Sequence, residues 1–282
     1  MAGPLKRVLM RSANNAMRGA DPARWHYGAG FDAARAADQH AALAALVSAS
    51  GATVEWVEDD EDGLADSVFT HDPSLMTDQG AVILRMGKPL RSPEPDLHAR
   101  TYAALGIPEL GRIEAPGTVE GGDCVWLDRN TLAVGRGVRT NQEGIQQLAN
   151  LLGRVGVSVF GYDLPLWHGE EACLHLMSVI SPLADDCALV FSPLLPAPLW
   201  QELRRRGIRL VEGDADEFHA SVGLSLNVLA VAPMKAIAVA GFPRTKAAME
   251  AAGCAVETFE ADALCIPCEG GPTCLTRPIL RG

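Results

Sequence analysis

Apolar residues follow two spacings along the chain, and the change from one spacing to the other recurs. Stretches rich in Ala and Leu, with helical spacing of the apolar positions, end at a glycine and are followed by short β-branched runs. A glycine just past a helix readily adopts the left-handed conformation found there. The pattern predicts helices over residues 31–50, 96–105, 142–155, 199–206 and 244–252, closed by Gly51, Gly106, Gly156, Gly207 and Gly253.

Short apolar runs between these helices have the composition of β-strands. They cover residues 53–57, 81–84, 131–134, 157–160, 188–191, 208–211, 227–231, 236–240 and 254–257. Turn-forming residues at 128–131 and 232–235 predict hairpins. The chain is therefore expected to use one unit of two or three strands and one helix five times.

The five predicted helix ends lie 46 to 55 residues apart. A period of this length indicates a repeat architecture. An open array would need polar terminal repeats, which we do not see, whereas a closed ring of five ββαβ units needs none. An ordinary α/β sandwich with coincidental spacing is the alternative, and the spacing alone leaves both open. In either case no linker divides residues 1–282, which predicts a single domain.

Composition and charge exclude several classes of protein, although they say little about the fold. The 282 residues are 48% hydrophobic and 21% charged, which is typical of a globular chain. The net charge of −11 argues against a nucleic-acid partner. The sequence has no apolar run long enough to cross a membrane, and its N-terminus has no signal-peptide core. Seven cysteines, an odd number, indicate reduced thiols in the cytoplasm rather than a disulfide framework.

Polar residues in otherwise apolar or glycine-rich surroundings mark five short segments. They are residues 66–73, 120–123, 139–141, 174–176 and 270–274. Each segment opens or closes a different repeat. In a ring the equivalent ends of all five units converge on one axis, so a Cys, a His and several carboxylates would meet there.

Two of these segments carry candidates for nucleophilic chemistry. Cys274 follows a Gly-Gly-Pro-Thr turn that can present a thiol outward, and a nearby imidazole could hold it as thiolate. His175 lies between Leu174 and Leu176, so strand alternation would point it away from both. A buried structural Cys and a half-buried, hydrogen-bonded His are the plain alternatives.

The acidic candidates have equally plain alternatives. Glu120 precedes two glycines and could orient an imidazole, although Gly-Gly-Asp is also ordinary turn chemistry. Asp66 and Asp72 flank Phe69, and two carboxylates beside an aromatic ring suit a flat cation such as guanidinium. Asp72 could instead cap a turn before Pro73.

No cofactor or metal is expected to be required. Cys265 and Cys268 form a C-x-x-C pair near Cys274, but no second ligand pair accompanies them, so a zinc site there would be incomplete. A thioredoxin-like redox pair is also a poor fit, because Gly-Gly-Pro follows where a helix should begin. Phosphate-binding and dinucleotide-binding glycine motifs are absent from the sequence.

At these segments the chain resembles the dimethylarginine dimethylaminohydrolases, relatives of arginine deiminases and amidinotransferases. The resemblance rests on several motifs in one order, from about residue 53 to the end. They are Asp-Ser-Val-Phe-Thr-His-Asp-Pro at 66–73, Ile-Glu-Ala-Pro-Gly-Thr-Val-Glu-Gly-Gly-Asp at 113–123, Gly-Arg-Gly-Val-Arg-Thr-Asn-Gln-Glu-Gly at 135–144, Leu-His-Leu at 174–176, Gly-Phe-Pro-Arg-Thr-Lys at 241–246 and Gly-Gly-Pro-Thr-Cys-Leu at 270–275. The resemblance implies a five-bladed α/β propeller, in agreement with the five helix ends.

Roles for individual residues follow from the resemblance. It implies that Cys274 is the nucleophile, His175 the general acid and base, and Glu120 the carboxylate that orients the imidazole. Asp72 would hold the guanidinium with Phe69 packed on it. Asp66, Arg91 and Arg139 would bind the amino-acid end of the substrate. The implied reaction is hydrolysis of an arginine-type guanidinium to citrulline and an amine through a covalent thiouronium, with a small guanidino molecule as the partner and a homodimer left open.

Two positions bear on which guanidinium is accepted. Arginine deiminases usually carry an acid two residues after the catalytic His, and here that residue is Met177, which suits an alkylated guanidinium with fewer N–H groups. His71 replaces the Glu that is usual in methylarginine hydrolases. An arginine deiminase or dihydrolase, a hydrolase of another guanidino compound and a catalytically silent guanidine-binding propeller stay open. Residues 25–30 are expected to form a loop over the site.

Overall fold

A computed structural model describes residues 2–57, 63–169 and 173–282. Its strands are β1 (Leu5–Met10), β2 (Thr53–Trp56), β3 (Ser74–Thr77), β4 (Gly80–Ile83), β5 (Glu109–Arg112), β6 (Cys124–Asp128), β7 (Thr131–Arg136), β8 (Ser158–Asp163), β9 (Ile180–Ala184), β10 (Cys187–Val190), β11 (Arg209–Glu212), β12 (Leu229–Ala232), β13 (Lys235–Val239), β14 (Ala255–Phe259) and β15 (Arg277–Arg281). Its α-helices are α1 (Ala13–Met17), α2 (Pro22–Trp25), α3 (Ala33–Ala49), α4 (Glu94–Ala104), α5 (Gln142–Gly153), α6 (Ala197–Arg205), α7 (Ala215–Ala220), α8 (Pro243–Ala251) and α9 (Cys265–Cys268).

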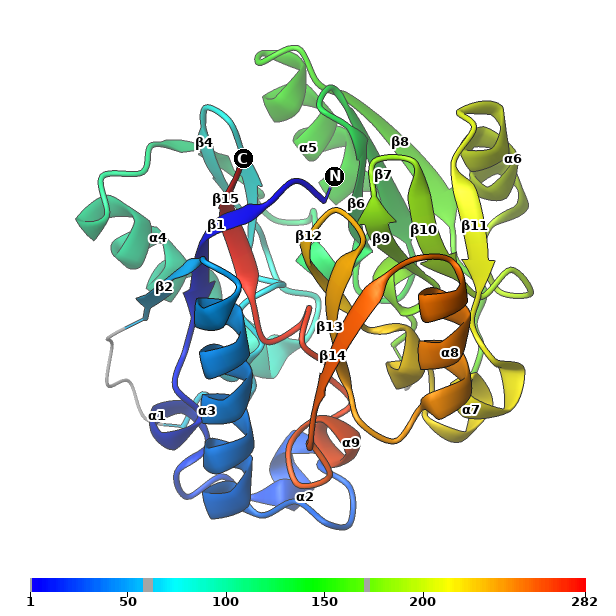
Figure 1. The fold of residues 1–282 in the computed structure, drawn as a ribbon. Helices are drawn as coiled ribbons and strands as arrows, with labels where there is room; N and C mark the ends of the chain where they lie inside the picture. The colour runs from blue at the N-terminus through cyan, green and yellow to red at the C-terminus, as the bar shows by residue number, and fades with distance from the viewer. Residues whose placement is uncertain (1, 58–62, 170–172) are drawn as a thin grey trace.

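The described strands form five three-stranded sheets built on one plan. In each sheet the middle strand pairs antiparallel with one neighbour and parallel with the other, as β4 does with β3 and β5. Parallel neighbours need a crossover connection, and a long helix supplies it in every sheet. These helices, α3, α4, α5, α6 and α8, lie around the periphery of the molecule (Figure 1). The predicted five-bladed propeller of ββαβ units is confirmed.

The first blade is assembled from both ends of the chain. Strand β1 pairs in parallel with β2 and antiparallel with β15, the last strand. A ring made this way leaves no terminal repeat exposed. The polar caps that an open array would need are therefore not required.

Glycines end the peripheral helices as expected. All five predicted cap glycines have positive φ, from 68° at Gly106 to 94° at Gly51. Each helix lies within a few residues of its predicted range. The predicted hairpin turns also connect strands, β6 to β7 and β12 to β13. The local signals in the sequence are therefore sufficient to locate the peripheral helix of each blade.

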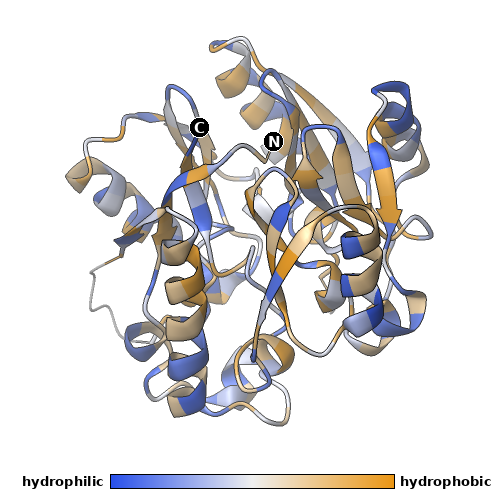
Figure 2. Ribbon diagram, in the orientation of Figure 1, coloured by the Kyte–Doolittle hydropathy of each residue, from blue (hydrophilic) through white to orange (hydrophobic). Residues whose placement is uncertain are grey.

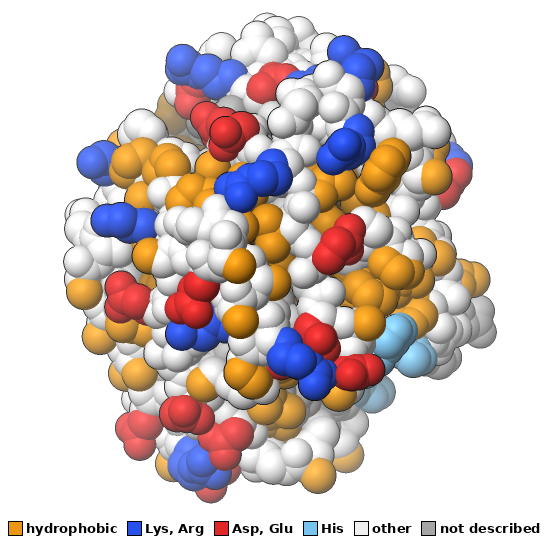
Figure 3. All heavy atoms as spheres, turned by 45° about the vertical axis from the view of Figure 1, so that its right-hand side comes forward, with side chains coloured by type: hydrophobic (Ala, Val, Ile, Leu, Met, Phe, Trp, Pro, Cys, Tyr) orange, Lys and Arg blue, Asp and Glu red, His pale blue; other side chains and the backbone are white. Residues whose placement is uncertain are grey.

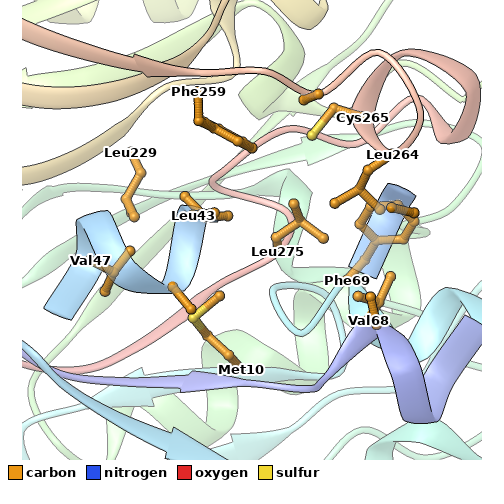
Figure 4. Packing of buried hydrophobic residues seen from close by; sticks show 14 of the residues in the cluster. Met10, Leu43, Val47, Val68, Phe69, Leu229, Phe259, Leu264, Cys265 and Leu275 are labelled. Atoms are coloured by element: carbon orange, nitrogen blue, oxygen red, sulfur yellow. The ribbon is translucent and has the colours of Figure 1, made fainter. Parts of the chain in front are cut away.

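The hydrophobic core consists of clusters that join neighbouring blades. One cluster combines Met10, Leu43 and Val47 of the first blade with Leu229 and Phe259 of the last (Figure 4). The peripheral helices carry hydrophilic residues among hydrophobic ones, as α3 and α8 show in Figure 2, because only one side of each faces a sheet. The packing between blades fixes the loops that meet on the axis.

The surface shows mixed charge. On the face in Figure 3, acidic and basic side chains are interspersed. None of the described helices combines the length and apolar character needed to cross a membrane. All seven cysteines are free thiols.

Candidate active site

Cys274 lies on the turn between α9 and β15, where Asn227 holds it from the neighbouring blade. Asn227 Nδ2 donates a hydrogen bond to Cys274 Sγ over 2.9 Å, and Asn227 Oδ1 accepts one from the amide of Thr273 over 3.0 Å. A Cβ at Gly271 would stand 2.6 Å from Asn227 Oδ1, so only glycine lets the turn pack this closely. One side chain thus fixes both the turn and the sulfur.

The surroundings of Cys274 favour the neutral thiol when no ligand is present. Burial raises the pKa of the Cys274 thiol, and the charge of Asp72 raises it further. The Asn227 hydrogen bond, the charge of His175 and the amide of Gly271 act in the opposite direction. A cation placed beside the sulfur would shift this balance toward thiolate.

His175 and Glu120 form a hydrogen-bonded pair. His175 Nε2 lies 2.9 Å from Glu120 Oε2, and the Glu120 side chain has no exposed surface. The other oxygen, Glu120 Oε1, accepts the amides of Gly87 at 2.9 Å and Lys88 at 3.1 Å. Leu174 and Leu176 are buried, and His175 keeps 19% of its side-chain surface exposed, as predicted, although His175 precedes a short 3₁₀-helix at Leu176–Ser178 rather than lying in a strand.

The imidazole of His175 is held as a cation. Burial lowers its pKa, but nearby Cys173, Asp123 and Glu120 outweigh this and hold the pKa well above its ordinary value. In return, His175 helps to keep the pKa of buried Glu120 low. Nε2 carries the proton directed at Glu120, which leaves Nδ1 as the atom that can exchange a proton within the site.

Asp72 is a buried carboxylate with two fixed partners. Its Oδ1 accepts the amide of Gly122 at 2.9 Å, and its Oδ2 pairs with Arg91 Nη1 at 2.7 Å. Burial alone would raise the pKa of Asp72, but the charges of Arg91 and His175 bring it well below its usual value. The carboxylate is therefore ionised throughout the working pH range.

Gly122 brings the acid and the imidazole together. A Cβ at this position would stand 2.8 Å from His175 Nδ1 and 3.1 Å from Asp72 Oδ1. The two groups therefore flank the same glycine from different blades. The amide of His71, next to Asp72 in the chain, donates to Cys274 O at 3.1 Å, so the predicted nucleophile, base and guanidinium-binding acid lie in one region.

Phe69 and Asp66 border this region. A Cβ at Gly270 would meet the Phe69 ring at 2.3 Å, so the ring packs directly on the turn that carries the nucleophile. Figure 4 shows Phe69 beside Leu264 at the edge of the core. Asp66 accepts Tyr27 Oη at 2.9 Å and pairs with Lys88 Nζ at 2.6 Å.

The N-terminal segment reaches the site, as its glycines led us to expect. Lys88 Nζ lies 5.6 Å from the centroid of the Trp25 ring, and Tyr27 contacts Asp66. The amide of Gly28 donates to Pro267 O at 2.7 Å. Residues 25–28 therefore cover Asp66 and Lys88, and whether this cover moves stays a prediction.

The two arginines predicted at the site differ in their surroundings. Arg91 is buried, and its guanidinium donates hydrogen bonds to Asp72, Glu94 and Phe69 O. Arg139 is half-buried, with Nη1 3.4 Å from Glu120 Oε1. Their contacts with a substrate stay predictions.

The two positions that bear on specificity add no carboxylate. His71 is buried, its Nδ1 lies 2.9 Å from Thr276 O, and burial lowers its pKa to about 3, so it is neutral. Met177 is partly buried against the hydrophobic cluster around Leu183. Neither position therefore adds an acid beside Asp72, the carboxylate predicted to hold the guanidinium.

Sequence reasoning missed several residues that contact the predicted ones. They are Tyr27, Lys88, Asp123, Cys173 and Asn227. Among the described residues, the group of ligand-type side chains close enough to hold a metal ion is Glu120, Cys173 and His175, whose ligand atoms lie within 4.8 Å of one another. The Cys-Leu-His spacing gives the one local signal, since residues two apart in extended chain face the same side.

Fold and site together define a cysteine enzyme of the guanidino-modifying class. The family model described as arginine deiminase matches residues 60–197. The chain is 30% identical over 215 residues to the N(G),N(G)-dimethylarginine dimethylaminohydrolase of Pseudomonas aeruginosa, covering 76% of this chain and 77% of that protein. The chain belongs to the dimethylarginine dimethylaminohydrolase family of hydrolases.

Solved structures agree with this assignment. A dimethylarginine dimethylaminohydrolase bound as an adduct with S-methyl-L-thiocitrulline superposes with a TM-score of 0.79, at 26% identity and over 99% of this chain and 100% of that one. The N-terminal domain of a cyanobacterial arginine dihydrolase superposes with the same TM-score of 0.79 at 18% identity, over 98% of this chain and 97% of that one. The second likeness supports the fold alone.

Proposed function

We propose that this protein hydrolyses N-methylated arginine at the guanidinium carbon, releasing citrulline and an alkylamine. The observation that carries the proposal is the gathering of a held thiol, a Glu-paired imidazolium and an ionised buried carboxylate around one glycine-lined region. A guanidinium is a poor electrophile because its charge is delocalised. The site must therefore localise that charge and align the carbon for attack.

In the first half of the reaction, the Cys274 thiol loses its proton to solvent as the cationic substrate binds beside it. The Cys274 thiolate attacks the guanidinium carbon and forms a tetrahedral adduct. His175 donates its Nδ1 proton to the nitrogen of the departing alkylamine, and that C–N bond breaks. The product of this half-reaction is a thiouronium joined to Cys274 through a C–S bond.

In the second half, neutral His175 takes a proton from water at Nδ1. The resulting hydroxide attacks the thiouronium carbon, the C–S bond breaks and the Cys274 thiolate is released with a ureido product. Glu120 holds the Nε2 proton throughout, because its other oxygen is fixed by the amides of Gly87 and Lys88. The hydroxyl proton of this second adduct passes to solvent as the ureido carbonyl forms, the released alkylamine takes up a proton from solvent, and the Cys274 thiolate is reprotonated when the product leaves, so the cycle ends with His175 protonated as it began.

A methylated guanidinium suits the polar groups around Asp72 better than an unsubstituted one. Methylated nitrogens have fewer N–H groups to satisfy, and neither neutral His71 nor Met177 offers a carboxylate. An arginine deiminase or dihydrolase would use a second acid for those N–H groups. This difference favours the methylated substrate.

The amino-acid end of the substrate would meet Asp66, Arg139 and Lys88. Both cations are half-buried, with side chains 22% and 18% exposed for Arg139 and Lys88, and they suit a carboxylate. Arg91 would hold Asp72 in position rather than bind the substrate directly, since its guanidinium already donates hydrogen bonds to three acceptors within the protein. Phe69 would pack on the guanidinium face.

The deciding experiment is a steady-state comparison of dimethylarginine, monomethylarginine, arginine and agmatine, with ureido product and released amine both measured. We expect kcat/KM for a methylated arginine to exceed that for arginine. Cys274→Ser should abolish turnover, and Cys268→Ser, which removes another partly buried thiol, should retain it. A clear preference for arginine would refute the substrate, and turnover by Cys274→Ser would refute the mechanism.

We further propose that residues 1–282 act as one catalytic domain in a reducing compartment. The site draws on residues from Trp25 to Cys274, and the first blade needs the C-terminal strand β15 paired with β1. Seven free thiols support a reducing environment. A cytoplasmic location satisfies both features.

A further inference from the structure

We propose that Lys88 determines which end group the enzyme accepts on its substrate, and that it favours a guanidino carboxylate without an α-ammonium group over the free amino acid. Lys88 holds Asp66, the carboxylate that would otherwise bind that ammonium. The preference rests on the proposed function for the reaction at the guanidinium carbon. It adds a second selection, at the opposite end of the same molecule.

Asp66 has both carboxylate oxygens engaged by the chain itself. Its Oδ1 accepts a hydrogen bond from Tyr27 Oη at 2.9 Å, and its Oδ2 pairs with Lys88 Nζ at 2.6 Å. Only 7% of the Asp66 side chain is exposed. Burial and the charge of Asp66 raise the pKa of Tyr27, so its hydroxyl stays a neutral donor. The carboxylate is therefore enclosed and already balanced by one cation.

The surroundings of Lys88 Nζ are those of an ammonium-binding site. A carboxylate oxygen and the Trp25 ring both lie near it, with the ring centroid 5.6 Å away. An ammonium is attracted both by a carboxylate and by the face of an indole ring. The chain thus places its own ammonium where that of an amino-acid substrate would bind.

The backbone fixes Lys88 beside the catalytic pair. Its amide donates to Glu120 Oε1 at 3.1 Å, and Arg139 Nη1 lies 3.4 Å from the same oxygen. Gly87 lets the two segments approach each other, because a Cβ there would stand 2.6 Å from Arg139 O. Two cationic residues therefore flank Glu120 on its Oε1 side, while Oε2 faces His175.

The charges select a substrate with one anionic end. The two carboxylates, Asp66 and Glu120, each already hold a cation of the chain, so neither is free for a second ammonium. An α-ammonium would share Asp66 with Lys88 or displace it, and either arrangement places like charges together in a half-buried site. A substrate carboxylate meets Arg139 and the remaining N–H groups of Lys88 instead.

The test compares three substrates that share one guanidinium, with both methyl groups on the same nitrogen, and differ at the other end. They are dimethylarginine, its des-amino analogue, which keeps only the carboxylate, and its decarboxylated analogue, which keeps only the ammonium. Steady-state kcat/KM is measured from released dimethylamine for wild type, Lys88→Met, Lys88→Arg and the control Lys235→Met, an exposed lysine on β13. Circular dichroism checks that each variant is folded.

We expect wild type to prefer the des-amino analogue over dimethylarginine by at least about tenfold in kcat/KM, with the decarboxylated analogue the poorest. Lys88→Met frees Asp66 and removes a partner of the substrate carboxylate. The KM for dimethylarginine should therefore fall relative to that for the des-amino analogue, and the preference should reverse. Because the Met variant keeps the amide bonded to Glu120, kcat should change less than KM. Lys88→Arg and Lys235→Met should keep the wild-type order.

A wild-type preference for dimethylarginine over its des-amino analogue overturns the inference, and this comparison needs no variant. A ratio that Lys88→Met leaves unchanged also overturns it. If wild type turns over none of the three compounds, the proposed function fails, and calorimetric titration of Cys274→Ser with the same compounds still decides the role of Lys88. Tighter binding of the des-amino analogue supports that role, whereas absent, equal or weaker binding overturns it.

Discussion

Individual residues at the active site are fixed by contacts between blades. Asn227, from the loop before β12, reaches the turn of Cys274 and bonds both the sulfur and the Thr273 amide. The donor on Nδ2 stabilises a thiolate, and the acceptor on Oδ1 holds the turn. Because the donor and the acceptor are different atoms of one amide, a substitution can remove the hydrogen bond to the sulfur and keep the one to the turn.

Asn227→Asp should retain the acceptor and remove the donor. A carboxylate beside the sulfur raises the pKa of Cys274 further, so less thiolate exists near neutral pH. We expect iodoacetamide to alkylate Cys274 at least about tenfold more slowly in Asn227→Asp than in wild type near neutral pH. A rise of one unit in the thiol pKa lowers the fraction of thiolate about tenfold. The rate should recover as the pH is raised.

The control for this prediction is Asn227→Ala, which removes both hydrogen bonds. It should loosen the turn as well as raise the thiol pKa, so its alkylation rate should fail to recover fully at high pH. Equal alkylation of wild type and Asn227→Asp at every pH would show that the amide donor does not influence the sulfur.

The sequence identified residues of distinctive type and missed those that act through contacts. Cys274, His175, Glu120 and Asp72 stand in unusual local settings, so pattern and resemblance both single them out. Asn227 and Lys88 have no such setting. Their importance comes from a partner about 20 to 50 positions away, as the separations of 47 and 22 residues to Cys274 and Asp66 show.

At the scale of elements, glycines decide where the helices end. Helix α5 ends at Gly153, and Gly156 follows with φ of 78°. A Cβ at either position would meet nothing within 4 Å. The two sites therefore differ in backbone conformation and not in packing, which makes them a matched pair.

Alanine at these two glycines should have opposite effects. Gly156→Ala should lower the free energy of unfolding by about 1 kcal/mol, because an L side chain is strained at positive φ. Gly153→Ala should raise it by about 0.5–1 kcal/mol, because alanine is favoured in a helix. Chemical denaturation of both variants measures the difference, and equal shifts would contradict the assignment of Gly156 as the helix cap.

The five peripheral helices and the middle strands of four blades were predicted, whereas the middle strand β1 and several outer strands were not. The middle strands β4 and β10 are buried along their whole length, which gives continuous apolar runs. The outer strand β5 is four residues long, exposed at both ends and contains Gly111. Such a strand is specified by its pairing with β4 rather than by its own composition.

At the scale of the whole molecule, the ring is closed by the chain termini. Strands β1 and β15 share a sheet, the amide of Gly282 donates to Pro4 O at 2.8 Å, and Arg281 Nη1 donates to Gly3 O at 2.9 Å. The ends therefore meet within one blade. Local patterns could predict five units, but closure depends on this pairing across the full length of the chain.

A circular permutant should retain the fold, because in a closed ring no blade is first. The old termini would be joined by a flexible linker of about four residues. The new termini would lie between Arg129 and Asn130, which are exposed at the β6–β7 turn. We expect native circular dichroism, cooperative thermal unfolding and unchanged turnover relative to wild type. A matched permutant opened between Leu132 and Ala133, both fully buried in β7, should unfold or aggregate because the cut interrupts a middle strand. If the turn permutant also fails to fold, the continuity of the chain between β6 and β7 matters more than ring closure, and the blades are not equivalent as folding units.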